Sequence, residues 1–395
     1  MNQKMMMWLL FVLMVTGVLA GCGGSRQTGD SGQAEGGRQA GSSGQAGSSR
    51  QAGSSGQAGS GGHAGNPDED TKVKLSRITP DTKIEELEEG LSVVRYEGDY
   101  GFQEFLEQGG ADSDAGVVGY VGSRLSENIP GLLFGGNSFG CSTISVENQD
   151  GGYFFGRNFD WNSCNALIIS AKPDQGYASV STVNMDFIQA GGMDISKLPD
   201  SAQAAIGLYA PLDGMNEMGL AVSVNMIDDS ARIEQDTHRP GLTTTTAVRL
   251  LLDQAADVEE ALELLGQYDL HGSMGMMIHF ALADAEGNSV VVEYVNNERI
   301  VNETPVVTNF YLAKGGKYGV GSSQSHIRYD MLQEILGEQG TMTLADVREA
   351  LDSVSKDNFG EFESTEWSIV MDQEKKELTY FHRENYTKGY TVAIG

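Results

Sequence analysis

A thiol, a guanidinium and a carboxylate lie close together near the middle of the chain, at Cys141, Arg157 and Asp160. Cys141 opens an alternating run that ends at Glu147, a pattern typical of a half-buried strand. A Gly-rich turn follows, and a second strand is predicted over 153–156. This hairpin would carry Arg157 and Asp160 back towards Cys141. There the guanidinium would favour the thiolate, and the carboxylate would hold a cationic amine nearby.

The local pattern alone also fits a second interpretation of Cys141. Most free cysteines are small buried hydrophobes without a chemical role. Features elsewhere in the sequence are needed to choose between these two interpretations.

The composition excludes several classes of partner. The 395 residues include 55 acidic and 26 basic side chains, for a formal net charge of -29. Binding to nucleic acid needs a basic footprint, and binding to an anionic membrane by charge needs one too, so neither is expected. Three cysteines are too few for a disulfide framework, and the six histidines show no metal-ligand spacing. We therefore expect no metal and no cofactor.

The first residues form a targeting segment. A short positive region at Lys4 precedes an apolar run from Met5 to Val18, which is too short and too early for a spanning helix that is retained. The run ends in Leu-Ala-Gly-Cys at 19–22, which resembles the lipobox of bacterial lipoproteins. That resemblance implies removal of residues 1–21, a diacylglycerol on the sulfur of Cys22, and a lipid-anchored protein on the extracytoplasmic side of the cell membrane. The alternative is an ordinary secretory signal with a chance cysteine.

Three further segments come after the leader. Residues 22–71 repeat Gln-Ala-Gly-Ser-Ser-Gly almost unchanged and have few large apolar side chains, so they cannot offset the entropy of ordering and form a flexible tether. Residues 72–140 carry sparse apolar patches between Gly-rich breaks and make a poor independent domain. They are interpreted as a propeptide-like segment that packs on the residues C-terminal to it. Those residues, 141–395, form the working domain.

The working domain is predicted to alternate between pairs of strands and pairs of helices. Strand pairs, then helix pairs, then strand pairs fit an α+β layered domain with antiparallel sheets. Helix starts are indicated by a cap or capping box near Thr244, at Asp257, at Ser325 and at Thr343. The predicted strands are 166–170, 178–183, 219–225, 276–283, 289–295, 305–309, 367–371 and 378–381.

With these features in place, the sequence resembles the choloylglycine hydrolase family of linear-amide hydrolases. That family includes bile salt hydrolases and penicillin V acylases, with acid ceramidase and N-acylethanolamine acid amidase as relatives. Each motif is weak alone, but the set occurs in family order across 141–395, about two-thirds of the chain. The motifs are Cys-Ser-Thr-Ile at 141–144, Gly-Arg-Asn-Phe-Asp at 156–160, Asp-Gly-Met-Asn-Glu-Met-Gly-Leu at 213–220, Val-Thr-Asn at 307–309 and Ser-His-Ile-Arg-Tyr at 325–329.

The resemblance implies a fold and a nucleophile. The fold would be the four-layer αββα sandwich of N-terminal-nucleophile hydrolases, with two antiparallel sheets between helices. The nucleophile must be the first residue of its chain, because its free α-amino group serves as the base. A thiol and an α-amine have pKa values close enough to exchange a proton near neutral pH. By matching position, Cys141 would attack the amide, Arg157 would support the thiolate, and Asp160 would hold the α-amine.

The resemblance also assigns three downstream residues. Asn309 would donate its side-chain amide to the oxyanion, the backbone near Asn225 would supply a second donor, and Arg328 would anchor the cluster. Taken singly, Asn309 also fits a turn residue and Arg328 a surface ion pair. Cys164 matches no family position and is interpreted as structural.

One departure from bile salt hydrolases concerns the length of chain before the cysteine. Those enzymes lose only a start methionine, whereas 140 residues precede Cys141 here. Acid ceramidase and its acylethanolamine relative also carry a long preceding segment, which is removed by self-cleavage. Gly140 is compatible with that step, because a residue without Cβ tolerates a strained backbone. The hypothesis is that Cys141 attacks the Gly140 carbonyl and leaves two chains, 22–140 and 141–395, which would remain associated.

Three classes of function are weighed. The leading one is an extracytoplasmic, lipid-anchored hydrolase of carbon–nitrogen bonds in linear N-acyl amides that acts through an acyl-enzyme, with a slight preference for lipid-like amides. A bile salt or penicillin V hydrolase is the alternative within that class. A solute-binding lipoprotein with an inert internal Cys141 is the alternative outside it, and a catalytically dead member of the family is the third possibility.

Overall fold

The computed structural model describes residues 82–125, 132–134, 139–190, 195–356 and 364–395, all within a unit that runs from Thr71 to Gly395. The predicted leader, Cys22, the tether and the first ten residues of the propeptide-like segment lie outside the described residues. Among the helices that the structure does describe, none is long and apolar enough to cross a membrane.

One sheet has nine strands, and two strands that precede the predicted cleavage site form one of its edges. Neighbouring strands are antiparallel except for β2 and β6, which pair in parallel. In spatial order the strands are β1 (Ile84–Glu88), β2 (Leu91–Glu97), β6 (Ala166–Lys172), β7 (Ser179–Asn184), β9 (Asp213–Asn216), β10 (Ala221–Met226), β13 (Ile278–Ala283), β14 (Ser289–Val295) and β15 (Glu298–Glu303).

The second sheet has seven strands and is built around the predicted hairpin. The hairpin is confirmed, and its register places Cys141 opposite Phe159 and Gly140 opposite Asp160. The last strand of this sheet, β20, was not predicted; it is short and lies at an exposed edge. The strands are β16 (Val306–Val307), β4 (Gly140–Asn148), β5 (Tyr153–Trp161), β18 (Ser364–Asp372), β19 (Glu377–His382) and β20 (Gly389–Ala393), with β17 (Thr341–Met342) parallel to β4.

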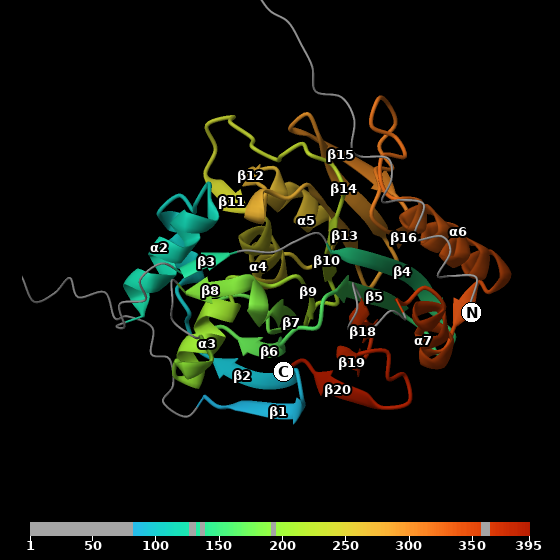
Figure 1. Cartoon of the computed structure of the whole chain (residues 1–395), viewed down its shortest axis with the longest axis horizontal. Coiled ribbons are helices and arrows are strands. Elements are labelled where there is room, and N and C mark those ends of the chain that lie inside the picture. The colour runs from blue at the N-terminus through green and yellow to red at the C-terminus, as the bar shows by residue number, and fades with distance from the viewer. Residues whose placement is uncertain (1–81, 126–131, 135–138, 191–194, 357–363) are drawn as a thin grey trace, which may run out of the picture. The chain divides into compact units, whose positions relative to one another are not determined.

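Helices cover the outer face of each sheet, so the described domain is an α+β sandwich of four layers, αββα, as predicted (Figure 1). The nine-stranded sheet carries α3 (Asp200–Gly207) and α4 (Thr244–Gln254), with α5 (Val258–Leu265) beside α4. The seven-stranded sheet carries α6 (Ser323–Glu338) and α7 (Leu344–Ser353). The remaining elements are α1 (Phe102–Glu107), α2 (Asp114–Arg124) and two small sheets, β11 (Gly241–Thr243) with β12 (Asp269–His271) and β3 (Leu132–Phe134) with β8 (Ile188–Ala190).

The predicted start of α6 is wrong by one turn. Ser322, and not Ser325, has the extended backbone of an N-cap, and its side chain accepts a hydrogen bond from the Ser325 backbone N–H. Both serines precede the same run of residues, so the sequence pattern could not separate them. The Ser325 hydroxyl is therefore released from capping, and it accepts a hydrogen bond from the Asn309 backbone instead.

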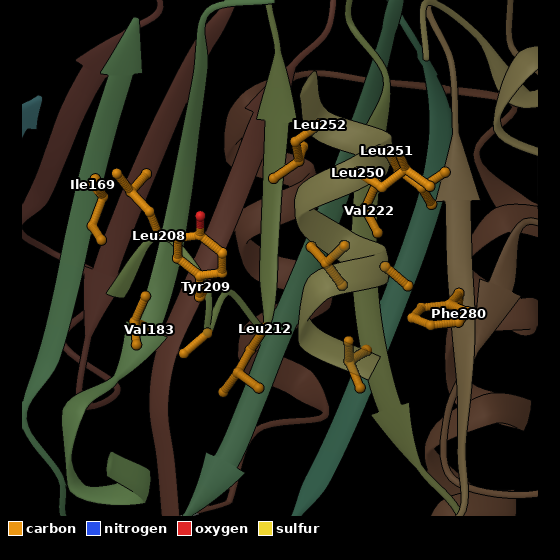
Figure 2. Close-up of a cluster of buried hydrophobic side chains, with 14 of the residues drawn as sticks. Ile169, Val183, Leu208, Tyr209, Leu212, Val222, Leu250, Leu251, Leu252 and Phe280 are labelled. Carbon is orange, nitrogen blue, oxygen red and sulfur yellow. The ribbon is translucent and has the colours of Figure 1, made fainter. Parts of the chain in front are cut away.

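The core lies in three layers of side chains between the four layers of backbone. Figure 2 shows part of this core under α4, where Leu250 and Leu251 lie near Val222 of β10. A separate cluster fills the space between the seven-stranded sheet and α6 and α7. Each of these side chains is buried, and burial of a large apolar side chain stabilises a fold by about 1.5–3 kcal/mol. The core therefore holds both sheets rigidly around the residues that lie between them.

Candidate active site

The two-residue period of a strand separates the predicted site residues onto two faces. Cys141 of β4 and Arg157 of β5 point towards the nine-stranded sheet, where both contact the carbonyl oxygen of Val224. Ser142 and Asp160 point the other way and contact Arg328 of α6. The site therefore runs through the seven-stranded sheet, with the thiol on one face and the carboxylate on the other.

Cys141 is completely buried, and each of its polar groups has a partner. Its Sγ donates to the Val224 carbonyl oxygen at 3.5 Å, and its backbone N–H donates to Asn309 Oδ1 at 2.8 Å. Its carbonyl oxygen accepts from Arg328 Nη1 at 2.6 Å. The Cys141 nitrogen is the atom that would become the α-amine if the preceding bond were cut. An acceptor for that amine is therefore already in place.

Arg157 is the charged side chain with the largest electrostatic effect on the Cys141 thiol, and it is itself fully buried. Its Nε donates to Asp213 Oδ2 at 3.0 Å, and the same oxygen accepts from Trp367 Nε1 at 3.0 Å. Its Nη2 donates to the Val224 carbonyl at 3.1 Å. Burial raises the pKa of the Cys141 thiol, and the Arg157 guanidinium opposes that rise without cancelling it. Burial is the larger of the two effects, so the neutral thiol is favoured in the intact chain, while Arg157 acts on the pKa in the direction that the sequence predicted.

Asp160 lies directly against the predicted cleavage site. A Cβ placed on Gly140 would lie 2.7 Å from Asp160 Oδ2 and 3.0 Å from Asp160 Cβ, so only glycine fits opposite this carboxylate. The other carboxylate oxygen accepts from Thr365 Oγ1 at 2.7 Å. Arg328 Nη1 lies 3.5 Å from Oδ2. The absence of a Cβ at Gly140 is thus needed for close packing, whereas its backbone lies in a regular strand and does not have the positive φ that would require glycine.

Asn309 connects the two faces. Its Oδ1 accepts from the Cys141 N–H and from Arg328 Nη2, each at 2.8 Å, and its Nδ2 donates to the Met226 carbonyl at 2.7 Å. The amide nitrogen carries two hydrogens, and the contact with Met226 needs one of them. The second can serve an oxyanion, as the resemblance implies for this residue.

Asn225 lies beside Arg157 and does not contact Cys141 among the hydrogen bonds of the described residues. Its Oδ1 accepts from Ser223 Oγ at 2.7 Å and from Arg157 Nη1 at 3.4 Å. Its Nδ2 donates to the carbonyls of Val307 and Thr308 at 3.4 and 3.5 Å. The Asn225 side chain therefore supports the segment before Asn309, and an oxyanion donor from the backbone near Asn225 stays a prediction.

A pocket of about 740 Å³ opens onto this cluster. Phe139 and Gly140 form part of its wall, beside Asn309 and Arg328. Four methionines also line it, at positions 226, 274, 276 and 277. The pocket therefore reaches the bond that precedes Cys141, while the sulfur itself stays buried behind that bond.

Several partners of the site were missed by the sequence analysis. Asp213 was part of a quoted motif, but no strand was predicted there, and nothing in the motif marked Asp213 as the partner of Arg157. Ser142 was treated as an ordinary strand residue, because a hydroxyl on a strand carries no signal of its own. Thr365 lay just outside the predicted strand 367–371, whereas β18 begins at Ser364. Across the described ranges, no group of three or more His, Cys, Asp or Glu side chains is placed to hold a metal ion.

The fold and the site together define a class. Two stacked sheets, largely antiparallel and covered by helices, form the architecture of N-terminal-nucleophile hydrolases. A family model confirms this at sequence level: that of acyl-coenzyme A:6-aminopenicillanic acid acyl-transferase matches residues 146–386, more than half of the chain. The chain belongs to this choloylglycine hydrolase-like family, so the resemblance predicted from the motifs is confirmed. The match starts after Cys141 and includes Arg157, Asp160, Asn225, Asn309 and Arg328.

Solved structures show three likenesses of low identity. A mutant of the conjugated bile acid hydrolase from Clostridium perfringens is 18% identical, with a TM-score of 0.47 over 64% of this chain and 92% of that one. Penicillin V acylase from Agrobacterium tumefaciens is 20% identical, with a TM-score of 0.44 over 64% and 84%. The N-acylethanolamine-hydrolyzing acid amidase ortholog of Caenorhabditis elegans is 14% identical, with a TM-score of 0.40 over 65% and 100%. No curated protein matches the chain.

Proposed function

We propose that the protein is a hydrolase of linear N-acyl amides whose nucleophile, Cys141, becomes N-terminal by self-cleavage. One observation carries the proposal: the nitrogen, the carbonyl and the preceding residue of Cys141 are each held by a different predicted site residue. Asn309 accepts from the nitrogen, Arg328 donates to the carbonyl, and Asp160 lies against Gly140. A structural cysteine needs none of these contacts.

Self-cleavage is the first step. The Cys141 sulfur attacks the Gly140 carbonyl carbon, the Gly140–Cys141 C–N bond breaks, and the thiol proton passes to the departing nitrogen. Water then hydrolyses the thioester, which leaves a carboxylate on Gly140 and a free thiol and α-amine on Cys141. The neutral thiol of the intact chain suits this step, because the proton that the nitrogen must gain is still on the sulfur.

The same groups then act on an external amide. The α-amine, held by Asn309 Oδ1 with Asp160 nearby, takes the proton from the thiol. The thiolate, stabilised by Arg157, attacks the amide carbonyl, the amine leaves with a proton from the α-amine, and water hydrolyses the acyl-enzyme. The second hydrogen of Asn309 Nδ2 stabilises the oxyanion. Departure of Phe139 and Gly140 from the wall of the pocket gives the acyl group access to the sulfur.

The pocket favours a flexible apolar acyl chain. Methionine side chains are unbranched and polarizable, so they adapt to irregular apolar ligands, and four of them line this pocket. This supports lipid-like N-acyl amides over bile salts or penicillin V, which remain the alternative substrates. A solute-binding lipoprotein accounts for the anchor and the tether, but it gives no role to the contacts of Cys141.

The segment before the cleavage site is proposed to stay bound as a second chain. Strand β2 pairs with β6 along its whole length, from Leu91 opposite Ala166 to Glu97 opposite Lys172. Glu88 of β1 also accepts from His382 Nδ1 at 2.8 Å and from Tyr390 Oη at 2.7 Å. This chain would carry the tether and the lipid on Cys22, and it would hold the catalytic chain at the outer side of the cell membrane.

The test is a panel of N-acyl amides that range from short to long acyl chains, with release of the amine as the readout. Wild-type protein is expected to cleave the long-chain members, and a C141A variant is expected to cleave none. A C164A variant is the matched control, because Cys164 is also buried but lies away from the pocket. Equal amine release by the wild type and C141A, or none by either, would contradict the proposal.

Asn309→Ala provides a graded test of the oxyanion role. Loss of one oxyanion donor typically costs about 10²–10³ in kcat. The variant should therefore keep binding substrate while kcat falls by that order. A kcat equal to that of the wild type would remove Asn309 from the mechanism.

A further inference from the structure

The peptide group that joins Thr308 to Asn309 is held at both ends by buried side chains. The Thr308 carbonyl oxygen lies 2.7 Å from His279 Nε2, and the Asn309 N–H donates to Ser325 Oγ at 2.7 Å. His279 and Ser325 are both completely buried. Because the oxygen and the hydrogen of one peptide plane are both fixed, the direction in which the Asn309 side chain leaves the backbone is fixed as well.

His279 is in turn held by Glu293. The Nδ1 atom of His279 lies 3.2 Å from Glu293 Oε1. The same carboxylate accepts from the backbone N–H groups of Leu312 and Ala313, at 2.8 and 2.5 Å. Glu293 therefore fixes the imidazole and the loop that follows Asn309 at the same time. A carbonyl oxygen can only accept, so the Nε2 atom of His279 carries a hydrogen and donates it to Thr308.

The two residues that reach the Thr308 carbonyl come from neighbouring strands of the nine-stranded sheet. His279 on β13 is the direct cross-strand partner of Asn225 on β10, and Asn225 Nδ2 also donates to that carbonyl, at 3.5 Å. Thr308 follows β16, which belongs to the seven-stranded sheet. The contact thus spans the gap between the sheets at the point where the site lies.

We propose that His279, fixed by Glu293, is a positioning residue that sets the orientation of the Thr308–Asn309 peptide and so places the Asn309 amide against Cys141. This inference rests on the proposed function only for its kinetic consequence. Its structural claim is that the orientation of the Thr308–Asn309 peptide depends on the hydrogen bond from His279 Nε2. A polar side chain at position 279 that lacks this hydrogen bond would not be enough.

Two substitutions of similar polarity distinguish the contact that His279 makes through Nε2 from the one that it makes through Nδ1. In H279Q the side-chain amide nitrogen reaches the place of Nε2 and can donate to the Thr308 carbonyl. In H279N the amide nitrogen reaches only the place of Nδ1, where it can donate to Glu293. Misplacement of a reacting group by 1 Å can cost roughly 10²-fold in rate, so H279N should lose on the order of that factor in kcat with KM little changed. H279Q should stay within about threefold of the wild type.

The experiment uses the full chain, with kcat expressed per processed molecule and thermal melting as the check on folding. The expected order is wild type, then H279Q, then H279N, with similar melting temperatures for the two variants. An H279N chain that stays uncut while H279Q is processed would support the same conclusion. Equal kcat values for the two variants, or an effect confined to KM, would overturn it.

A crystal structure of each variant keeps this test separate from the amidase proposal. If the wild type hydrolyses no amide, the proposed function is wrong. The crystal structures of the variants still show whether His279 sets the orientation of the Thr308–Asn309 peptide. A rotated Thr308–Asn309 peptide in H279N, with the wild-type orientation in H279Q, would support the inference. An unchanged peptide in H279N would overturn it.

Discussion

Two buried arginine–aspartate pairs in this domain look alike and have different surroundings. Arg157 and Arg249 are both fully buried. Arg157 Nε lies 3.0 Å from Asp213, and Arg249 Nη2 lies 2.8 Å from Asp253. Arg157 donates from all three of its nitrogens, whereas Nε and Nη1 of Arg249 have no hydrogen-bond partner among the described residues.

The neighbours of the two pairs explain the difference. Beside Arg157 is the thiol of Cys141, and the two share the Val224 carbonyl as acceptor. Beside Arg249 is Tyr100, whose hydroxyl donates to Asp253 and whose ring centroid lies 5.8 Å from the guanidinium carbon. Tyr100 belongs to the segment before the cleavage site, and Arg249 belongs to α4. A buried arginine–aspartate pair therefore does not by itself mark an active site. Here one pair lies beside the proposed nucleophile, and the other fastens one segment of the chain to another.

The largest expected difference between the pairs is in catalysis. In R157K the charge remains but the planar fork is lost, and a misplaced charge beside the thiol is expected to lower kcat/KM by roughly 10²-fold. R249K is the matched control, since it makes the same change at an equally buried site. Its activity per folded molecule should equal that of the wild type. Equal losses in both variants would show that stability, and not the thiol, explains the effect of Arg157.

A smaller effect is expected on the association of the two chains after processing. Tyr100→Phe removes the hydrogen bond to Asp253, and a hydrogen bond to a charged group contributes about 1.5–3 kcal/mol. The upstream chain should therefore dissociate at a lower denaturant concentration, as measured by size exclusion in a urea series. Tyr318→Phe, at an exposed position, serves as the control. If the two chains of Y100F dissociate at the same urea concentration as those of the wild type, the Tyr100–Asp253 hydrogen bond does not hold the two chains together.

An effect of similar size is expected in the pH dependence of stability. Burial raises the pKa of Asp253 from 3.8 to about 6. A raised pKa means that the folded state binds the proton more tightly, so the stabilisation is fully present below pH 3.8 and is lost as the pH rises through about 6. D253N should flatten this part of the profile when the free energy of unfolding is measured between pH 4 and 7. An unchanged slope in D253N would assign the dependence to other groups.

The sequence predicted the parts of this molecule that depend on local patterns. The β4–β5 hairpin, the start of α7 at Thr343 and the αββα class follow from alternation, caps and ordered motifs. The same motifs selected Cys141, Arg157, Asp160, Asn225, Asn309 and Arg328, and the structure brings all six into one cluster.

The features that the sequence did not predict depend on contacts between distant segments. The burial that keeps the Cys141 thiol neutral comes from packing between two sheets, and His279 meets Thr308 only because β13 lies opposite β16 across that gap. The role of Ser325 was hidden in the same way, since a serine before a helix is first interpreted as its cap. None of these contacts has a local signature.

The most direct test of self-cleavage at Cys141 is the intact mass of protein expressed without residues 1–22, compared with a C141A variant. The account predicts two fragments in the first sample, which meet at Gly140 and Cys141, and a single uncut chain in the variant. A single uncut chain in both samples, at mildly acidic as well as neutral pH, would leave Cys141 without its α-amine. The proposed mechanism would then have no base, and the solute-binding interpretation would take its place.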